Sequence, residues 1–216
     1  FMTYFIKELL GQASDKDDYV YLSDGGHFEN LGIYELVRRK CKLIIAFNAA
    51  SDPKMEFGDL ENAIRKCRLD FGANIEINVN DIRPQENNKR SSKKHYAIGK
   101  IRYSDNSEGI LLYHMLSLTG DEPLDIVSYS MANKDFPHQS TGDQWFDEDQ
   151  FECYRLLGYH IANEFFVNHS NVNWNEITSQ EIISNIEKIL EKNEKRRKNK
   201  ELTRKTKNND HFQAKD

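Results

Sequence analysis

Apolar residues recur along this chain with two periods, which separate the expected strands from the expected helices. Alternation at every second position, or a short unbroken apolar run, is typical of a strand. Apolar residues three and four positions apart are typical of a helix. The expected strands are 19–23, 42–47, 73–79, 95–103 and 110–118. The expected helices are 1–10, 28–40, 59–69, 123–133, 147–166 and 179–198.

The order of these elements predicts the fold class. Strand, helix, strand, helix and strand follow one another from 19 to 79, which indicates βαβ units and a largely parallel sheet. The polar turn at 104–109 makes the last two strands an antiparallel hairpin. We therefore expect an α/β protein with three α/β/α layers, a mainly parallel sheet, an added hairpin and C-terminal helices.

Charge is unevenly distributed over the 216 residues, whose net charge is -5. Between 188 and 207, ten Lys or Arg residues stand against three Glu. Such a basic block can contact nucleic acid or anionic lipid, but a solvated tail is the favoured interpretation. No apolar run reaches the roughly 18–20 residues of a membrane span. Aromatic residues are not interleaved with Lys and Arg as in an RNA-binding sheet, so we expect no nucleic-acid partner.

Cysteine usage indicates the compartment. Cys41, Cys67 and Cys153 are odd in number and widely spaced, with no C-x-x-C pair. Disulfides and a zinc–cysteine site are therefore not expected, and a reducing cytoplasm is favoured. The segment 1–10 is too short for a membrane span and lacks the features of a signal peptide. The first residue is Phe, which suggests a piece of a larger protein or an incomplete reading frame, with Met2 as an alternative start.

One short segment carries the main chemical signal. An aromatic and β-branched run ends at Asp24, Gly25 and Gly26 follow, and a helix is expected from residue 28. An acid after a strand and beside a helix start lies where α/β proteins place catalytic groups. An aspartate held within about 3 Å of a serine hydroxyl can act directly as its base. The positive end of a helix would favour its charged form. Turn chemistry alone is the alternative, since Asp-Gly is a common turn pair.

The residues around this turn extend the signal. The sequence from Ser23 to Gly32, Ser-Asp-Gly-Gly-His-Phe-Glu-Asn-Leu-Gly, closely resembles bacterial patatin-like and cytosolic phospholipase-type lipid acyl hydrolases. The resemblance covers about residues 19–165 and continues at 38–39, 41–45, 52–53, 59–60, 63–66, 70–72, 75–77, 117–123, 136–141 and 151–158. It implies that residues 1–170 are the C-terminal part of a patatin-like phospholipase domain. Residues 171–216 would be a charged, helical to disordered basic tail.

The same resemblance implies roles for single residues. Asp24 would be the base of a Ser–Asp dyad, with Gly25 and Gly26 shaping its turn. The family places its nucleophile in a Gly-x-Ser-x-Gly elbow upstream, beside a glycine-rich oxyanion loop, and this chain has neither. The nearest match surrounds Ser140, but His138 replaces the first glycine and no strand is expected before it. We therefore expect Ser140 to be a loop serine.

These implications define the expected function. The chain would be part of a lipid acyl hydrolase that acts on phospholipid or other acyl esters at a membrane surface, in the cytoplasm or peripheral to a membrane. It would be inactive without the N-terminal part of the same domain. The mechanism requires no metal or organic cofactor, and the substrate-binding residues are unassigned. The competing class is non-catalytic: a truncated paralogue that acts as an interaction or membrane-surface module.

Residues near the turn also receive structural interpretations. His27 could form the Asp–His pair of a serine triad, but a turn or helix-start residue is favoured. Ser23 has no nucleophile elbow around it and is interpreted as structural. Glu29 and Asn30 are expected to cap the following helix.

Three further groups are weighed in the same way. Asp121 and Glu122 are expected to cap a helix that begins at Pro123. A metal site is conceivable, but its candidate ligands have no ligand-like spacing: His138, Asp143 and Asp147. Several basic side chains could meet lipid phosphates, although solvated helix faces are favoured: Arg38, Arg39, Arg65, Lys66 and Arg68.

Overall fold

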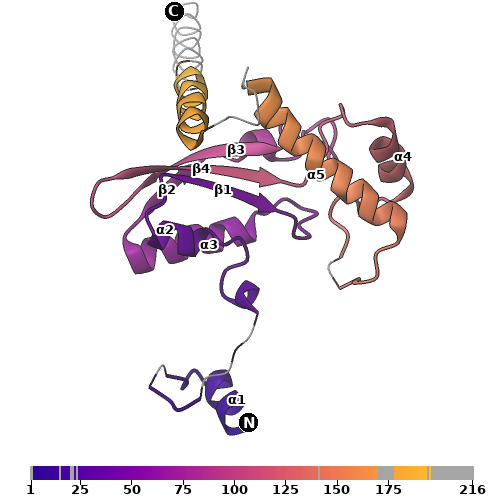
Figure 1. Ribbon diagram of the computed structural model, residues 1–216. Helices are drawn as coiled ribbons and strands as arrows, with labels where there is room; N and C mark the ends of the chain where they lie inside the picture. The colour runs from indigo at the N-terminus through magenta and orange to yellow at the C-terminus, as the bar shows by residue number, and fades with distance from the viewer. Residues whose placement is uncertain are drawn as a thin grey trace, which may run out of the picture.

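A mixed four-stranded sheet organises the described part of the chain (Figure 1). The computed structural model describes residues 2–14, 16–19, 22, 24–140, 142–169, 178–193 and 195. The strands are β1 (Leu43–Asn48), β2 (Asn74–Ile77), β3 (Tyr96–Arg102) and β4 (Glu108–Met115), in the order β1-β4-β3-β2. The α-helices are α1 (Met2–Leu9), α2 (Ile33–Arg38), α3 (Gly58–Phe71), α4 (Leu124–Ala132) and α5 (Glu148–His169), and residues 179–193 are also helical. Short 3-10 helices span Gly25–His27 and Asn80–Ile82.

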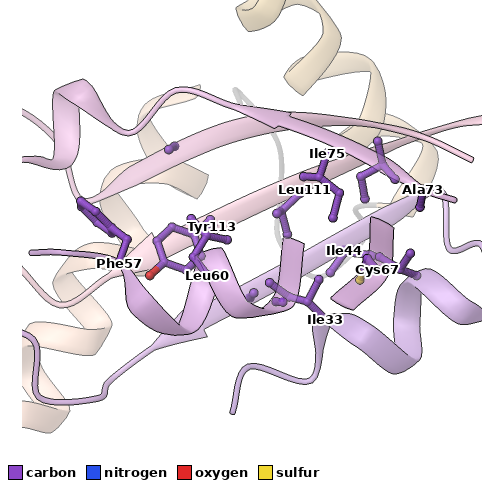
Figure 2. Packing of buried hydrophobic residues seen from close by; sticks show 14 of the residues in the cluster. Ile33, Ile44, Phe57, Leu60, Cys67, Ala73, Ile75, Leu111 and Tyr113 are labelled. Atoms are coloured by element: carbon purple, nitrogen blue, oxygen red, sulfur yellow. The ribbon is translucent and has the colours of Figure 1, made fainter. Parts of the chain in front are cut away.

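Helices cover both faces of this sheet, so the three α/β/α layers are confirmed. The main core lies between the sheet and α2 and α3, and Figure 2 shows Ile44, Ile75 and Leu111 of the strands beside residues of these helices. On the opposite face, α5 and the 179–193 helix pack on the strands through Phe165 and Ile186. Alternation along β4 serves both cores, because Leu111 and Tyr113 face one and Ile110 and Leu112 face the other.

A smaller core lies where α4 packs on α5. It consists of Leu118, Ile126, Phe136, Cys153, Leu157 and Ile161. The two helices are joined by a segment that contains the cis peptide bond between Phe136 and Pro137. This α4–α5 core fixes the position of α5 relative to the loop that follows β4.

The mainly parallel sheet is the part of the fold prediction that is wrong. Only β1 and β4 pair in parallel, while β3 pairs antiparallel with both β4 and β2. The connection from β1 through α3 to β2 exists, but the hairpin of β3 and β4 lies between those two strands. The physical reason is burial: seven of the eight β4 residues are buried, which a central strand requires, whereas the four-residue β2 suits an edge.

Most predicted elements are confirmed within two or three residues, and the N-terminal third contains the exceptions. Tyr19 and Leu22 are exposed and not in a strand, contrary to the predicted strand at 19–23, and Val20, Tyr21 and Ser23 lie outside the described residues. The helix expected at 28–40 is the shorter α2. The helix α1 buries none of its residues and projects away from the layers (Figure 1). The predicted tail beyond residue 195 lies outside the described residues.

No helix in the described ranges is long and apolar enough to cross a bilayer.

Candidate functional site

Asp24 lies in an exposed turn and caps a single turn of 3-10 helix. Its Oδ1 accepts a hydrogen bond from Gly26 N at 2.9 Å, and its backbone carbonyl accepts one from His27 N at 3.2 Å. Within the described residues, the Gly26 N–H is the one donor that reaches this carboxylate. One carboxylate oxygen is thus oriented by the chain, and the side chain is open to solvent.

The two glycines after Asp24 have different roles. A Cβ on Gly26 would lie 2.9 Å from Asn30 Oδ1 and 3.3 Å from Asp24 Oδ1, closer than ordinary contacts allow. A Cβ on Gly25 would meet nothing within 4 Å. A side chain at position 26 would therefore displace the Asn30 side chain, whereas the space around Gly25 gives no structural reason for a glycine there.

The turn is attached to α3. Asn30 Nδ2 donates to Asp59 Oδ2 at 3.1 Å, and Asn62 Nδ2 donates to the Phe28 carbonyl at 3.0 Å. The Lys66 ammonium lies 3.4 Å from the centre of the Phe28 ring, which makes a cation–π contact. Asp24 is thereby held relative to the main core through three side chains of one helix.

The expected helix dipole at Asp24 is absent, because α2 begins nine residues later at Ile33. Glu29 takes the capping role that was predicted for it: its carboxylate accepts from Leu31 N at 2.7 Å and Tyr34 N at 3.2 Å. Asn30 binds α3 instead of capping α2. The negative charge at the start of α2 is therefore that of Glu29, not that of Asp24.

The structure describes two of the three other serine and histidine candidates. His27 is the last residue of the 3-10 turn, and its side chain is exposed. Ser23 lies outside the described residues. Ser140 is an exposed loop residue whose Oγ accepts from Gly142 N at 3.2 Å.

The basic residues on the helices have partners on their own surfaces. Arg38 and Arg39 bind Glu35 at 2.7 and 2.8 Å, and these hydrogen bonds lower the pKa of the Glu35 carboxyl to about 2. Arg65 lies 3.6 Å from Glu61. These pairs fit the solvated helix faces that were favoured.

The structure does not bring His138, Asp143 and Asp147 together as a metal site. His138 Nδ1 accepts from Asp52 N at 3.4 Å. Asp143 accepts from Trp145 N at 3.1 Å and Asp147 from Gln150 N at 2.7 Å, so both carboxylates hold local turns.

A different group of ligand-type side chains does converge, which the sequence had not indicated. One ligand-type atom from each of His95, Asp121, Glu122 and His160 lies within 4.8 Å of the others. We call this group the His95 cluster. Asp121 and Glu122 do not cap α4 as expected: Glu122 accepts from Thr119 N and Gly120 N in its own turn. Among the four members only Asp121 and Glu122 are close in sequence, so no local spacing could have revealed the cluster.

Burial shifts the titration of this region. His95 is fully buried, and desolvation lowers its pKa to about 4, which leaves a neutral imidazole at pH 7. Its Nδ1 lies 2.9 Å from Ser117 Oγ. Desolvation raises the pKa of the neighbouring Glu164 carboxyl, whose Oε2 lies 3.8 Å from His95 Nε2.

Comparison with known proteins identifies no relative: no family model, curated protein or solved structure matches this chain.

Proposed function

We propose that this chain supplies the general base, Asp24, of a Ser–Asp lipid acyl hydrolase of the patatin-like type. The nucleophilic serine and the oxyanion hole would come from polypeptide outside these 216 residues. The observation that carries the proposal is the state of the Asp24 carboxylate, which is exposed and oriented by a single backbone N–H. The ten-residue block around it resembles the corresponding segment of that family.

In the proposed chemistry the turn supplies one reacting group, the Asp24 carboxylate. Asp24 accepts the proton of the serine hydroxyl as the serine oxygen attacks the ester carbonyl. The alcohol leaves with that proton, and an acyl-enzyme remains. Water then attacks the acyl-enzyme, again losing a proton to Asp24, and releases the fatty acid and the free serine. Backbone N–H groups would stabilise the oxyanion in both steps.

The contacts between the turn and α3 support the proposal, because a general base has to be held in a fixed position. The turn is restrained by the contacts that Phe28 and Asn30 make with side chains of α3. Because a misplaced base loses much of its effect, Asn30 is a positioning residue in this proposal. Three unpaired cysteines agree with the cytoplasmic location that we propose.

The decisive experiment uses the full-length protein, after its coding sequence has been read for a Gly-x-Ser-x-Gly segment. With phospholipid vesicles as substrate, Asp24→Asn should lower kcat by about 10²–10⁴-fold, the usual range for loss of a general base. Asp18→Asn is the matched control, an exposed aspartate nearby, and should leave kcat unchanged. Full activity in Asp24→Asn would refute the proposal.

The isolated 216-residue chain provides a second check. It contains no nucleophile elbow, so we expect no ester hydrolysis from it. Hydrolysis by the isolated chain that disappears in Asp24→Asn would contradict the external serine. Restoration of turnover by a separately produced segment carrying the serine would support it.

The second candidate function is a non-catalytic membrane-surface module, and α1 is the observation that favours it. This helix buries none of its residues, and the apolar side chains of Met2, Ile6 and Leu9 are exposed. Such a helix can insert into the interface of a lipid bilayer. Co-sedimentation with anionic vesicles should then decrease in Ile6→Asp, and removal of residues 188–216 tests the basic tail separately. Unchanged sedimentation in both variants argues against this function.

A further inference from the structure

The His95 cluster joins three elements at the end of the sheet where β4 finishes. His95 directly precedes β3, and Asp121 and Glu122 belong to the loop between β4 and α4. His160 lies on α5, one helical turn before Glu164. Each element is fixed by a hydrophobic core, so the convergence of these side chains is a property of the fold and not of a mobile loop.

The spacing of the donor atoms suits a single metal ion. Donors around a tetrahedral ion with bonds of about 2.0–2.2 Å lie roughly 3.3–3.6 Å apart. The four donors here lie within 4.8 Å of one another, and His160 Nε2 is 3.3 Å from Asp121 Oδ1. Small side-chain rotations would therefore complete a coordination sphere.

Carboxyl groups gather in this place, and the Lys94 charge also acts on one of them, Glu164. Asp121, Glu122 and Glu164 contribute three carboxylates, and no Lys or Arg of the described residues forms an ion pair with them. Glu164 Oε2 is buried and has no hydrogen-bond donor among the described residues. A buried, unsatisfied carboxylate oxygen is costly, and a bound cation would remove that cost.

The hydrogen bonds of His95 are compatible with a role as a ligand. With its proton on Nδ1, the ring donates to Ser117 Oγ, and Nε2 becomes free to coordinate. With its proton on Nε2, the ring instead donates to Thr119 Oγ1 at 3.0 Å, and the threonine hydroxyl donates to Asp121. The second arrangement is a metal-free network, so the cluster can switch between the two by moving one proton.

We propose that the His95 cluster binds one divalent transition-metal ion, with zinc as the best-matched probe. The ligands are His95, His160, Asp121 and Glu122, and Glu164 lies beside them as a further carboxylate. Two imidazoles favour zinc and its neighbours over magnesium or calcium, which prefer oxygen ligands. Binding requires the Thr119 hydroxyl to rotate away from the three side chains that it now contacts, those of His95, Asp121 and Glu122. The ion would clamp β3, the β4–α4 loop and α5 together.

Metal titration of the untagged, chelator-treated chain tests this site. We expect one zinc ion per chain by equilibrium dialysis. At a hundredfold excess over Kd, Tm should rise by about 5–10 °C. His160→Gln and Asp121→Asn should each weaken zinc binding by at least about tenfold and remove most of the Tm rise. The matched controls His27→Gln and Asp18→Asn, both at exposed positions, should behave as the wild type.

Two further measurements keep the result interpretable. Asp121 is largely exposed, so Asp121→Asn should fold even if His160→Gln does not. Thr119→Val removes the hydroxyl of the metal-free network and should still bind zinc. Cobalt binding should give the visible bands of a tetrahedral site without sulfur charge transfer, which excludes the cysteines as ligands. Absence of zinc binding, equal binding in both cluster variants, or a cobalt–sulfur spectrum would each overturn the proposal.

Discussion

The Asp24 turn and the His95 cluster are built in opposite ways. Asp24 is exposed, belongs to one continuous segment, and is attached to the body by side chains of α3. The His95 cluster draws on three elements, and its central histidine is fully buried. The turn is recognisable from ten consecutive residues, whereas the cluster is visible only in three dimensions. A local motif thus supports a hypothesis about chemistry without fixing the surroundings of the residue, and a packed fold can bring together ligand-type side chains that no local motif contains.

Substitutions beside the two regions should differ most in how much they lower the free energy of unfolding. Leu157 is fully buried in the α4–α5 core and lies on the helix that carries His160. Leu157→Ala should lower the free energy of unfolding by about 2–5 kcal/mol because it leaves a cavity. Phe28→Ala, at a half-exposed ring beside the Asp24 turn, should cost about 1 kcal/mol or less. Urea denaturation of both variants measures the difference, and equal losses would contradict the comparison.

Acid should lower the stability of the protein through a buried histidine, His114, on the sheet face that α5 covers. His114 is buried, stacks on Phe47 with ring centroids 4.5 Å apart, and its pKa is lowered to about 4 from 6.5, mainly by desolvation. Between these values the unfolded chain binds a proton that the folded chain does not. Stability therefore falls as pH decreases from 6.5 to 4, by up to roughly 3 kcal/mol for this residue.

Denaturation at several pH values with His114→Phe tests that contribution. The variant should lose this part of the acid sensitivity and show no loss of stability at pH 7, because both ring nitrogens of His114 lack hydrogen-bond partners in the described residues. His27→Asn, at an exposed histidine, is the control and should keep the wild-type slope. An unchanged slope in His114→Phe would mean that another group titrates.

A smaller effect should reveal the capping role of Glu29. Glu29 is buried and accepts from two backbone N–H groups at the start of α2, while Asp24 accepts from one in the open. Glu29→Gln should cost about 1–2 kcal/mol, since one acceptor and its charge are lost. Glu61→Gln, on the exposed face of α3, should change stability by less than about 0.5 kcal/mol in the same denaturation experiment.

The smallest expected effect distinguishes the neighbouring glycines. Gly26→Ala forces Asn30 away from its position and weakens its hydrogen bond to Asp59, at a cost of about 0.5–1 kcal/mol. Gly25→Ala has open space and should be neutral or slightly stabilising. Thermal denaturation compares the pair. Under the proposed function, Gly26→Ala should also lower the kcat of the full-length protein, and a larger loss of kcat in Gly25→Ala would contradict the geometry.

Much of the fold could be predicted from residues that are neighbours in sequence. The apolar run that became β1 and the hairpin of β3 and β4 follow from local periodicity and turn residues. Glu29 as a capping residue was predicted correctly for the same reason. Asp24 as a catalytic base stays a prediction, because the structure gives its exposure and its one hydrogen bond but not the serine that it would serve.

The amino-acid sequence by itself determined the type and approximate limits of most elements, because helix and strand periods depend on residues a few positions apart. Only the tertiary structure decided that β4, the most buried strand, lies beside β1, and that β2 moves to the far edge. It also decided that His95, Asp121 and His160 meet. These outcomes depend on how apolar faces from distant segments share one core, and no local pattern contains that information.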